Sequence, residues 1–321
     1  MIFPFLRGFI APHLAPFTYF LFAINLFVFV ATMEAFDRAD SRLDKILADS
    51  QFLSTQGSAF AVMIYREPAH FTPNLRKLAS NAQHGDSDAR SVLGNLALRN
   101  NEFMSKAEKY EFGGDEVALE SWRKSFSALK ETQDEHPSYQ WGISQLRDGW
   151  HQWVSYQFSH SGVFHLFWNM IFLVLFGAFV ETKLGASFVI LTYLGGGVFG
   201  ALLFSILSGV SSSPLVGASA AVSGLMGLVG VYWWKREKVS FFYWLLPIKG
   251  YFGFVALPSW IVIIVSLLPD LSGYLAASQE FGSVAYAAHL GGAAWGAAMA
   301  GFVAIGLMEK EVDDQEENSA A

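Results

Sequence analysis

A serine and a histidine, seventy residues apart, are the residues of this sequence best suited to covalent chemistry. Ser219 lies in a turn of small residues that begins at Gly217, directly before an apolar helix, and His289 lies inside a second apolar helix. A histidine in hydrocarbon is costly, which indicates a function and a partner. A serine hydroxyl becomes a nucleophile when a positioned base takes its proton, and imidazole titrates in a suitable range. The pair predicts a dyad, because neither helix supplies an acidic residue to orient the imidazole.

Acyl transfer also requires hydrogen-bond donors for the oxygen that becomes negative in the transition state. The backbone N–H of Ser219, at the positive end of its helix, is one candidate. His165 and Asn169 are four residues apart in an earlier apolar helix, so their side chains share one face and are further candidates. The alternative is that one is an interfacial polar residue and the other a hydrogen bonder between helices.

Composition indicates the environment in which these residues act. The chain has 321 residues, of which 53% are hydrophobic and 15% are charged, and its mean hydropathy is +0.33. These values are typical of a membrane protein. The net charge is −7 with no extended basic cluster, so nucleic acid is excluded as a partner. The absence of cysteine excludes disulfides and thiolate metal sites.

The charges divide the chain into four segments. Residues 37–150 hold 31 of the 49 acidic and basic residues. We expect an N-terminus and first span in residues 1–36, a mostly helical extramembrane insertion in 37–140, a membrane core in 141–308 and an acidic tail in 309–321. The apolar run from Pro16 to Phe36 is long enough to anchor the chain, although a signal peptide is the alternative. The histidines of the insertion lack ligand spacing, so neither a metal nor a cofactor is expected; they are His70, His84 and His136.

Five further spans are expected after the insertion. The pattern Gly177-x-x-x-Glu181-x-x-x-Gly185 closes the second span, and we expect Glu181 to have a structural role, bonding backbone in the turn. Gly292 and Gly296 follow His289 along one stripe of the last helix, and small stripes let helices approach closely in lipid. The expected spans run from about residue 158 to Val180, from Ser187 to Leu207, from Ser219 to Trp234, around Tyr251–Leu268, and from Val284 to Met308.

The basic residues of the short loops predict the orientation, because Lys and Arg are retained in the cytoplasm. We expect a bacterial inner-membrane protein with both termini in the cytoplasm. In this orientation the short outer loops contain no Lys or Arg, and the insertion lies outside. Ser219 and the upper part of the His289 helix then lie at similar depth near the outer face. The short cytoplasmic segments contain Arg7, Lys183, Lys235, Arg236, Lys238, Lys249 and Lys310.

Four motifs in this order resemble the rhomboid intramembrane serine proteases. The resemblance covers about residues 141–308 and implies an all-α polytopic protein, a bundle of six transmembrane helices around a water-filled cavity. It implies cleavage of transmembrane segments of single-pass or polytopic membrane proteins near the outer surface of the lipid bilayer. Ser219 would be the nucleophile, His289 the base, and Asn169 and His165 oxyanion-hole donors. The motifs are Gly217-x-Ser219, His289-x-x-Gly292-x-x-x-Gly296, His160-x-x-x-x-His165-x-x-x-Asn169 and the Gly177 to Gly185 pattern.

Two positions depart from the family pattern. Ala220 follows the serine where a glycine is usual, and its methyl group is a candidate to crowd the oxyanion site. Ser223 stands where many members have tyrosine or phenylalanine, beside the expected place of the His289 ring. Two other functions are compatible with a polar pair in the membrane: an inactive rhomboid-like protein that binds membrane clients, and a small transporter. The inactive protein predicts loss of Ser219 or His289, and both residues are present. The transporter predicts internal repeats or charged mid-membrane helices, and the sequence has neither.

Overall fold

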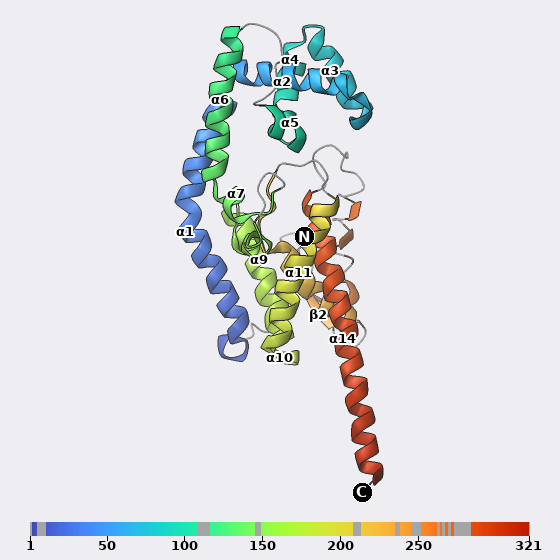
Figure 1. Cartoon of the computed structure of the whole chain (residues 1–321). Coiled ribbons are helices and arrows are strands. Elements are labelled where there is room, and N and C mark those ends of the chain that lie inside the picture. The colour runs from blue at the N-terminus through green and yellow to red at the C-terminus, as the bar shows by residue number, and fades with distance from the viewer. Residues whose placement is uncertain are drawn as a thin grey trace.

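The computed structural model of this chain consists mainly of helices, arranged as a bundle with a second helical region across one end (Figure 1). It describes residues 2–4, 11–107, 116–144, 149–207, 213–234, 238–244, 252–261, 264, 267–268, 271–272 and 284–320. The α-helices are α1 (Pro16–Leu47), α2 (Ser50–Arg66), α3 (Pro73–Gln83), α4 (Ser87–Ala97), α5 (Asn101–Lys106), α6 (Glu116–Glu135), α7 (Pro137–Trp141), α8 (Gln152–Ser155), α9 (Val163–Phe172), α10 (Ala178–Leu184), α11 (Ala186–Leu207), α12 (Ser219–Tyr232) and α14 (Val284–Ala320). Short helical turns are η1 (Pro12–Leu14), η2 (Pro68–His70), η4 (Tyr156–Phe158) and the π-turn η5 (Leu173–Gly177), which joins α9 to α10.

Among the described residues, four helices are long and apolar enough to cross a membrane. The helix that begins at Ser219 is apolar but shorter, ending at Tyr232. The chain is therefore an integral membrane protein, and the expected number of six spans stays a prediction. The first span continues as one helix into the polar segment, to Leu47. The four candidate spans are Pro16–Leu47, Val163–Leu184, Ala186–Leu207 and Tyr286–Gly306.

A small antiparallel sheet corrects the expectation of an all-α chain. Strand β2 (Lys238–Trp244) pairs with β1 (Ile2–Pro4) on one side and with β3 (Phe252–Pro258) on the other. The expected fifth span, around Tyr251–Leu268, is therefore wrong in its first part, which is strand β3. Aromatic and β-branched residues dominate β2, and these residue types favour an extended, paired backbone. The expected basic end of the Ser219 helix lies partly outside the described residues.

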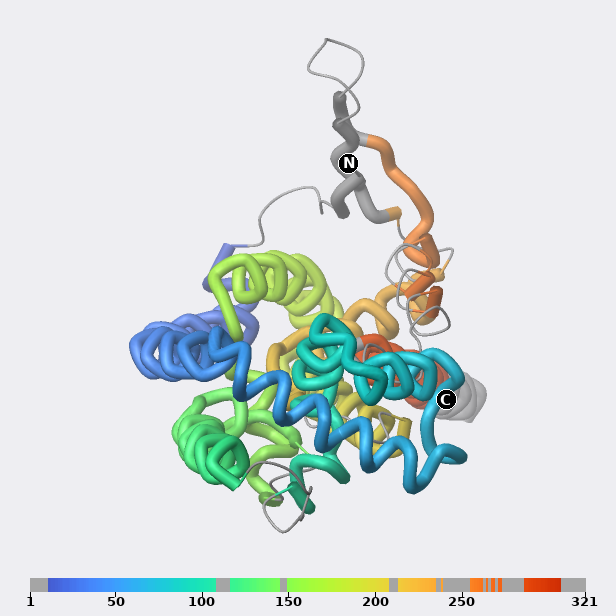
Figure 2. The backbone as a smooth tube through the Cα atoms, turned by 90° about the horizontal axis from the view of Figure 1, so that it is seen from above, coloured from blue at the N-terminus to red at the C-terminus, as the bar shows by residue number. Residues whose placement is uncertain are grey.

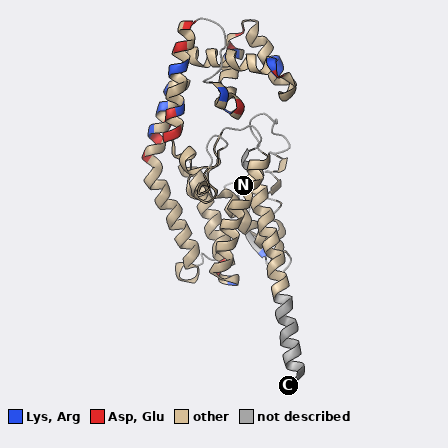
Figure 3. Cartoon of the chain, viewed as in Figure 1, with Lys and Arg blue, Asp and Glu red and all other residues tan. Residues whose placement is uncertain are grey.

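Helices α2 to α6 form the region that we call the helical layer. They pack around a core of large side chains that includes Phe60, Phe103, Trp122 and Phe126. Figure 2 shows α2 to α4 from above, lying across the end of the bundle, whereas α6 runs alongside α1 (Figure 1). Figure 3 shows that the acidic and basic residues of the described chain are concentrated on the layer and on the adjoining half of α1. This distribution follows the sequence pattern, in which the polar segment follows an uncharged apolar run.

The end of the helical layer is attached to the loop that precedes the Ser219 helix. After α6, His136 caps α7 and its Nε2 lies 3.0 Å from Asp40 Oδ1 on α1. Ile143 then forms an antiparallel bridge with Leu215, with N···O distances of 3.0 and 2.8 Å. The chain around Leu215 is thus held by backbone hydrogen bonds only four residues before Ser219. The remaining elements of the bundle position the side chains described next.

Candidate active site

A glycine turn sets the position of Ser219. Gly217 has φ of +112°, a region that favours glycine, and its N–H donates to Tyr156 O at 2.9 Å. A Cβ at this position would lie 2.6 Å from Cε1 and Nε2 of His165. Glycine is therefore required both by the backbone conformation and by the neighbouring ring. Ser219 is the first residue of α12, where backbone N–H groups have no partner within the helix and the helix dipole is positive.

His165 and Asn169 both lie beside this turn. They come from α9, and the Asn169 side-chain amide donates to His165 O at 3.0 Å. Asn169 Nδ2 is 3.7 Å from the point where a Cβ on Gly217 would lie. Asn169 is buried and His165 is half-buried, with its Nδ1 3.3 Å from Ser161 Oγ. The structure thus brings both expected oxyanion donors to the turn that opens the serine helix.

His160 also supports the turn, a role that the sequence did not reveal. Its Nε2 accepts a hydrogen bond from the Ala218 N–H at 3.3 Å, and its ring stands edge-on to the ring of His165, 5.2 Å between centroids. Burial, and secondly the neighbouring His165, lower the pKa of His160 to about 3. The ring is therefore neutral at pH 7, as an acceptor must be. The only sequence signal was its place five residues before His165.

Helix α14, which bears His289, makes backbone contact with α12. A Cβ on Gly292 would overlap the carbonyl group of Ala220, and one on Gly296 would overlap the carbonyl oxygen of Gly224. Gly292 follows His289 by three residues, so the crossing point lies about one helical turn from the imidazole. Ser219 and His289 are both half-buried, and His289 interacts electrostatically with His165. Ser219, His165 and Asn169 therefore lie around the N-terminal end of α12, and His289 lies on the helix that crosses α12 near this end.

The methyl group of Ala220 packs against a third helix. Ala220 is buried, and its Cβ lies 2.7 Å from the position a Cβ on Gly200 of α11 would take. The same position is 2.6 Å from Ala288 O of α14. The glycine at position 200 leaves the space that the alanine methyl fills. Ser223, the other departure, is buried one turn further along α12.

The side chain of Glu181, a residue of α10, reaches the start of α1 and takes the place of a local cap there. Its two carboxylate oxygens accept hydrogen bonds from Phe17 N at 2.9 Å, Thr18 N at 2.7 Å and Thr18 Oγ1 at 2.7 Å. Helix α1 has no side-chain cap of its own, and its first N–H groups need acceptors. A Cβ on Gly177 would lie 2.9 Å from Thr18 Cγ2. Glu181 thus binds backbone, as expected for a structural role. The backbone belongs to α1, however, and not to the turn that follows Glu181.

Comparison with known proteins gives the same assignment as the motifs. Residues 147–305 match the Rhomboid domain. The chain is 29% identical over 140 residues to "Rhomboid protein 1, mitochondrial" of Saccharomyces cerevisiae, covering 43% of this chain and 38% of the relative. It is 32% identical over 164 residues to "Rhomboid-like protein 11, chloroplastic" of Arabidopsis thaliana, covering 50% of this chain and 53% of the relative. The chain therefore spans about half or less of the length of these relatives.

The fold and the site define an integral membrane protein in which the helix that begins at Ser219 and the helix that bears His289 cross in close backbone contact. The chain belongs to the rhomboid family. The helical layer lies before the matched residues, so the family comparison covers the bundle from α8 to α14 and not the layer.

Proposed function

We propose that this protein is an intramembrane serine endopeptidase that cleaves transmembrane segments of other membrane proteins. The observation that carries the proposal is the packing around the start of α12. There the His165 ring lies against Gly217, and the backbone of α14 contacts the carbonyl group of Ala220. The proposal assigns each step of acyl transfer to a residue on the helices that meet at this point.

In the proposed reaction the His289 imidazole takes the proton of the Ser219 hydroxyl as Ser219 Oγ attacks the scissile carbonyl carbon. The carbonyl oxygen becomes negative and is stabilised by the Ser219 N–H, the Asn169 amide and His165. His289 then gives the proton to the leaving amine as the peptide C–N bond breaks. A water molecule repeats the sequence on the acyl enzyme, and no cofactor is required.

Orientation and substrate follow from the same proposal. Both termini lie in the cytoplasm of a bacterial inner membrane, and the helical layer lies outside. The support is the distribution of Lys and Arg among the short loops and the concentration of charge on the layer (Figure 3). Cleavage then takes place near the outer surface, in the transmembrane segments of single-pass or polytopic proteins.

Covalent labelling separates this function from a client-binding protein without activity and from a small transporter. A serine-directed fluorophosphonate should label the detergent-solubilised chain once, and Ser219→Ala and His289→Ala should each abolish labelling and cleavage of a model transmembrane substrate. The double variant should be no worse than either single one, because the two residues act as a unit. The matched control is Ser223→Ala, which removes a hydroxyl one turn away on α12 and should still be labelled. Labelling that persists in Ser219→Ala, or cleavage above about a tenth of the rate in His289→Ala, would contradict the dyad.

A further inference from the structure

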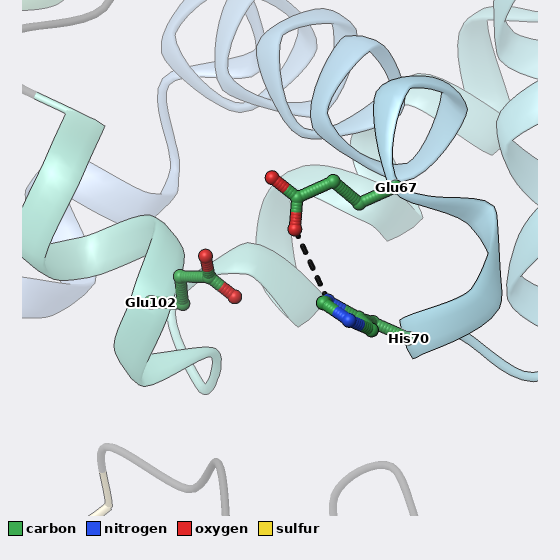
Figure 4. A group of neighbouring side chains, drawn as sticks. All are labelled: Glu67, His70 and Glu102. Atoms are coloured by element: carbon green, nitrogen blue, oxygen red, sulfur yellow. Dashed lines mark ion pairs between the residues drawn. The ribbon is translucent and has the colours of Figure 1, made fainter.

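Three possible metal ligands meet in the helical layer, outside the candidate active site. Figure 4 shows Glu67, His70 and Glu102 facing one another. His70 Nδ1 lies 3.1 Å from Glu67 Oε2, and one ligand atom from each of the three residues lies within 4.8 Å of the other two. Glu67 follows α2, His70 ends η2, and Glu102 lies in the first turn of α5. The grouping therefore joins two segments that are more than thirty residues apart in sequence.

Buried aromatic rings hold the backbone beneath these side chains. Phe71, next to His70, and Phe103, next to Glu102, both pack edge-on against Phe60, with centroid distances of 5.7 and 5.3 Å. Phe60 and Phe103 are fully buried. Two of the three ligands are thus each one residue from a ring that contacts the same core phenylalanine, which keeps their backbones at a constant separation.

Local hydrogen bonds stabilise both segments further. Pro68 begins η2, and the His70 N–H donates to Glu67 O at 3.1 Å, so Glu67 and His70 lie on one side of a tight turn. At the start of α5, the Asn100 side chain accepts from Phe103 N at 2.8 Å. Little backbone ordering therefore remains to oppose the binding of a ligand, and only the side chains need to adjust.

We propose that Glu67, His70 and Glu102 form a binding site for one divalent transition-metal ion of the zinc type. An imidazole with two carboxylates suits zinc, and three protein ligands leave a fourth position for water. Ligand atoms around a tetrahedral zinc ion are separated by roughly 3.3 Å. The pair formed by His70 and Glu67 already has such a spacing, and the ligand atom of Glu102, within 4.8 Å of both, would have to move closer when the ion binds.

Lys106 is the neighbouring cation that competes with the metal. It pairs with Glu102 Oε1 one turn along α5, while the second carboxylate oxygen of Glu102 remains to bind the ion. The bound metal would connect the end of α2 to α5, on the side of the layer nearer to the bundle (Figure 1). The site requires no proteolytic activity, so it is independent of the proposed function.

Calorimetric titration of the full-length, tag-free protein in detergent with zinc chloride tests the site. We expect one saturable equivalent, and binding weakened more than about tenfold in His70→Ala and in Glu102→Gln. His84→Ala is the matched control, because His84 is an exposed histidine of the same layer outside the cluster and should bind normally. Lys106→Met should tighten binding by roughly two- to fivefold, since it removes an exposed ion pair.

A second measurement distinguishes this site from other histidines of the chain. Cobalt(II) at one equivalent should give visible absorption bands in the full-length protein and in His84→Ala, but not in His70→Ala. Melting temperatures without metal should be the same for all variants, because the exchanged side chains are half-buried or exposed. Zinc binding that is absent from the unaltered chain, or that is unchanged in His70→Ala and Glu102→Gln, would overturn the proposal.

Discussion

The helical layer and the bundle are both helical, but different contacts stabilise them. The layer is filled by large side chains such as Phe60, Phe103 and Trp122, as expected where burial of apolar surface from water drives packing. In the bundle, the crossing of α12 with α14 is so close that a Cβ on Gly292 or Gly296 would meet backbone atoms. Lipid provides no comparable gain from burying apolar surface, so close backbone contact takes its place.

Helix starts differ between the two regions in the same way. In the layer, α2 to α5 each have a local side-chain cap, from Asp49, Thr72, Asp86 and Asn100. In the bundle, α1 and α12 have no local cap, and residues distant in sequence bind their first N–H groups: Glu181 for α1 and His160 for Ala218. Helix ends in the layer therefore form locally, whereas those near the active site require the assembled bundle.

The largest expected effect is in the layer. Phe60→Ala removes a fully buried ring and should lower the free energy of unfolding of the layer by about 3–5 kcal/mol. Hydrogen exchange should then show lost protection in α2 and α5, while α12 stays protected and Ser219 can still be labelled. The control is Tyr65→Ala, because Tyr65 is 75% exposed. Equal loss of protection in α12 would mean that layer and bundle unfold as one unit.

Removal of a distant cap should cost more than removal of a local one. Glu181→Ala leaves Phe17 N, Thr18 N and Thr18 Oγ1 without their buried carboxylate and should cost about 2–3 kcal/mol. Asp86→Ala, at the start of α4, should cost about 1 kcal/mol. Thermal unfolding of both variants in detergent measures the two losses of stability. If Asp86→Ala proved the more damaging change, the contrast between local and distant caps would not hold.

The close crossing predicts that a single added side chain disturbs both stability and activity. Gly292→Val places a branched side chain against the Ala220 carbonyl group and should cost about 1–3 kcal/mol. Labelling of Ser219 should fall with the melting temperature, because His289 lies on the displaced helix. Gly301→Val is the control on the same helix, since a Cβ there has no atom within 4 Å. A fully active and equally stable Gly292→Val would show that the two helices do not touch at this point.

The features that the sequence predicted are those with a local pattern. Long apolar runs indicate spanning helices, and the glycines that follow His289 lie at the crossing that their stripe predicts. Strand β3 was mistaken for a helix because a short run of apolar residues fits both periodicities. The hydrogen-bond partners of Glu181 and of His160 are more than fifty residues away in sequence. No local sequence pattern therefore reveals them. Glu102 joins Glu67 and His70 only through the packing of Phe103 on Phe60, which composition does not reveal.

The smallest expected effect concerns pH and the distant cap formed by His160. This residue precedes the span that begins at Val163, and burial lowers its pKa from 6.5 to about 3. Well above pH 6.5 both the folded and the unfolded chain carry the neutral ring, so His160 contributes no pH dependence to the free energy of unfolding in that range. As the pH falls below 6.5, only the unfolded chain takes up the proton, and the free energy of unfolding decreases by about 1.4 kcal/mol at pH 5.5.

Thermal melts at pH 8.0 and 5.5 should therefore show a smaller loss of stability in His160→Asn than in the unaltered protein. His84→Asn serves as the control, because His84 is exposed in the helical layer and should leave the pH dependence unchanged. His160→Asn should also be less stable at pH 8.0, since Asn is too short to accept from the Ala218 N–H at the same distance. An identical pH dependence in all three proteins would mean that the folded chain takes up the proton on His160 as readily as the unfolded chain, so that at pH 5.5 the ring could no longer accept the hydrogen bond that supports the serine turn.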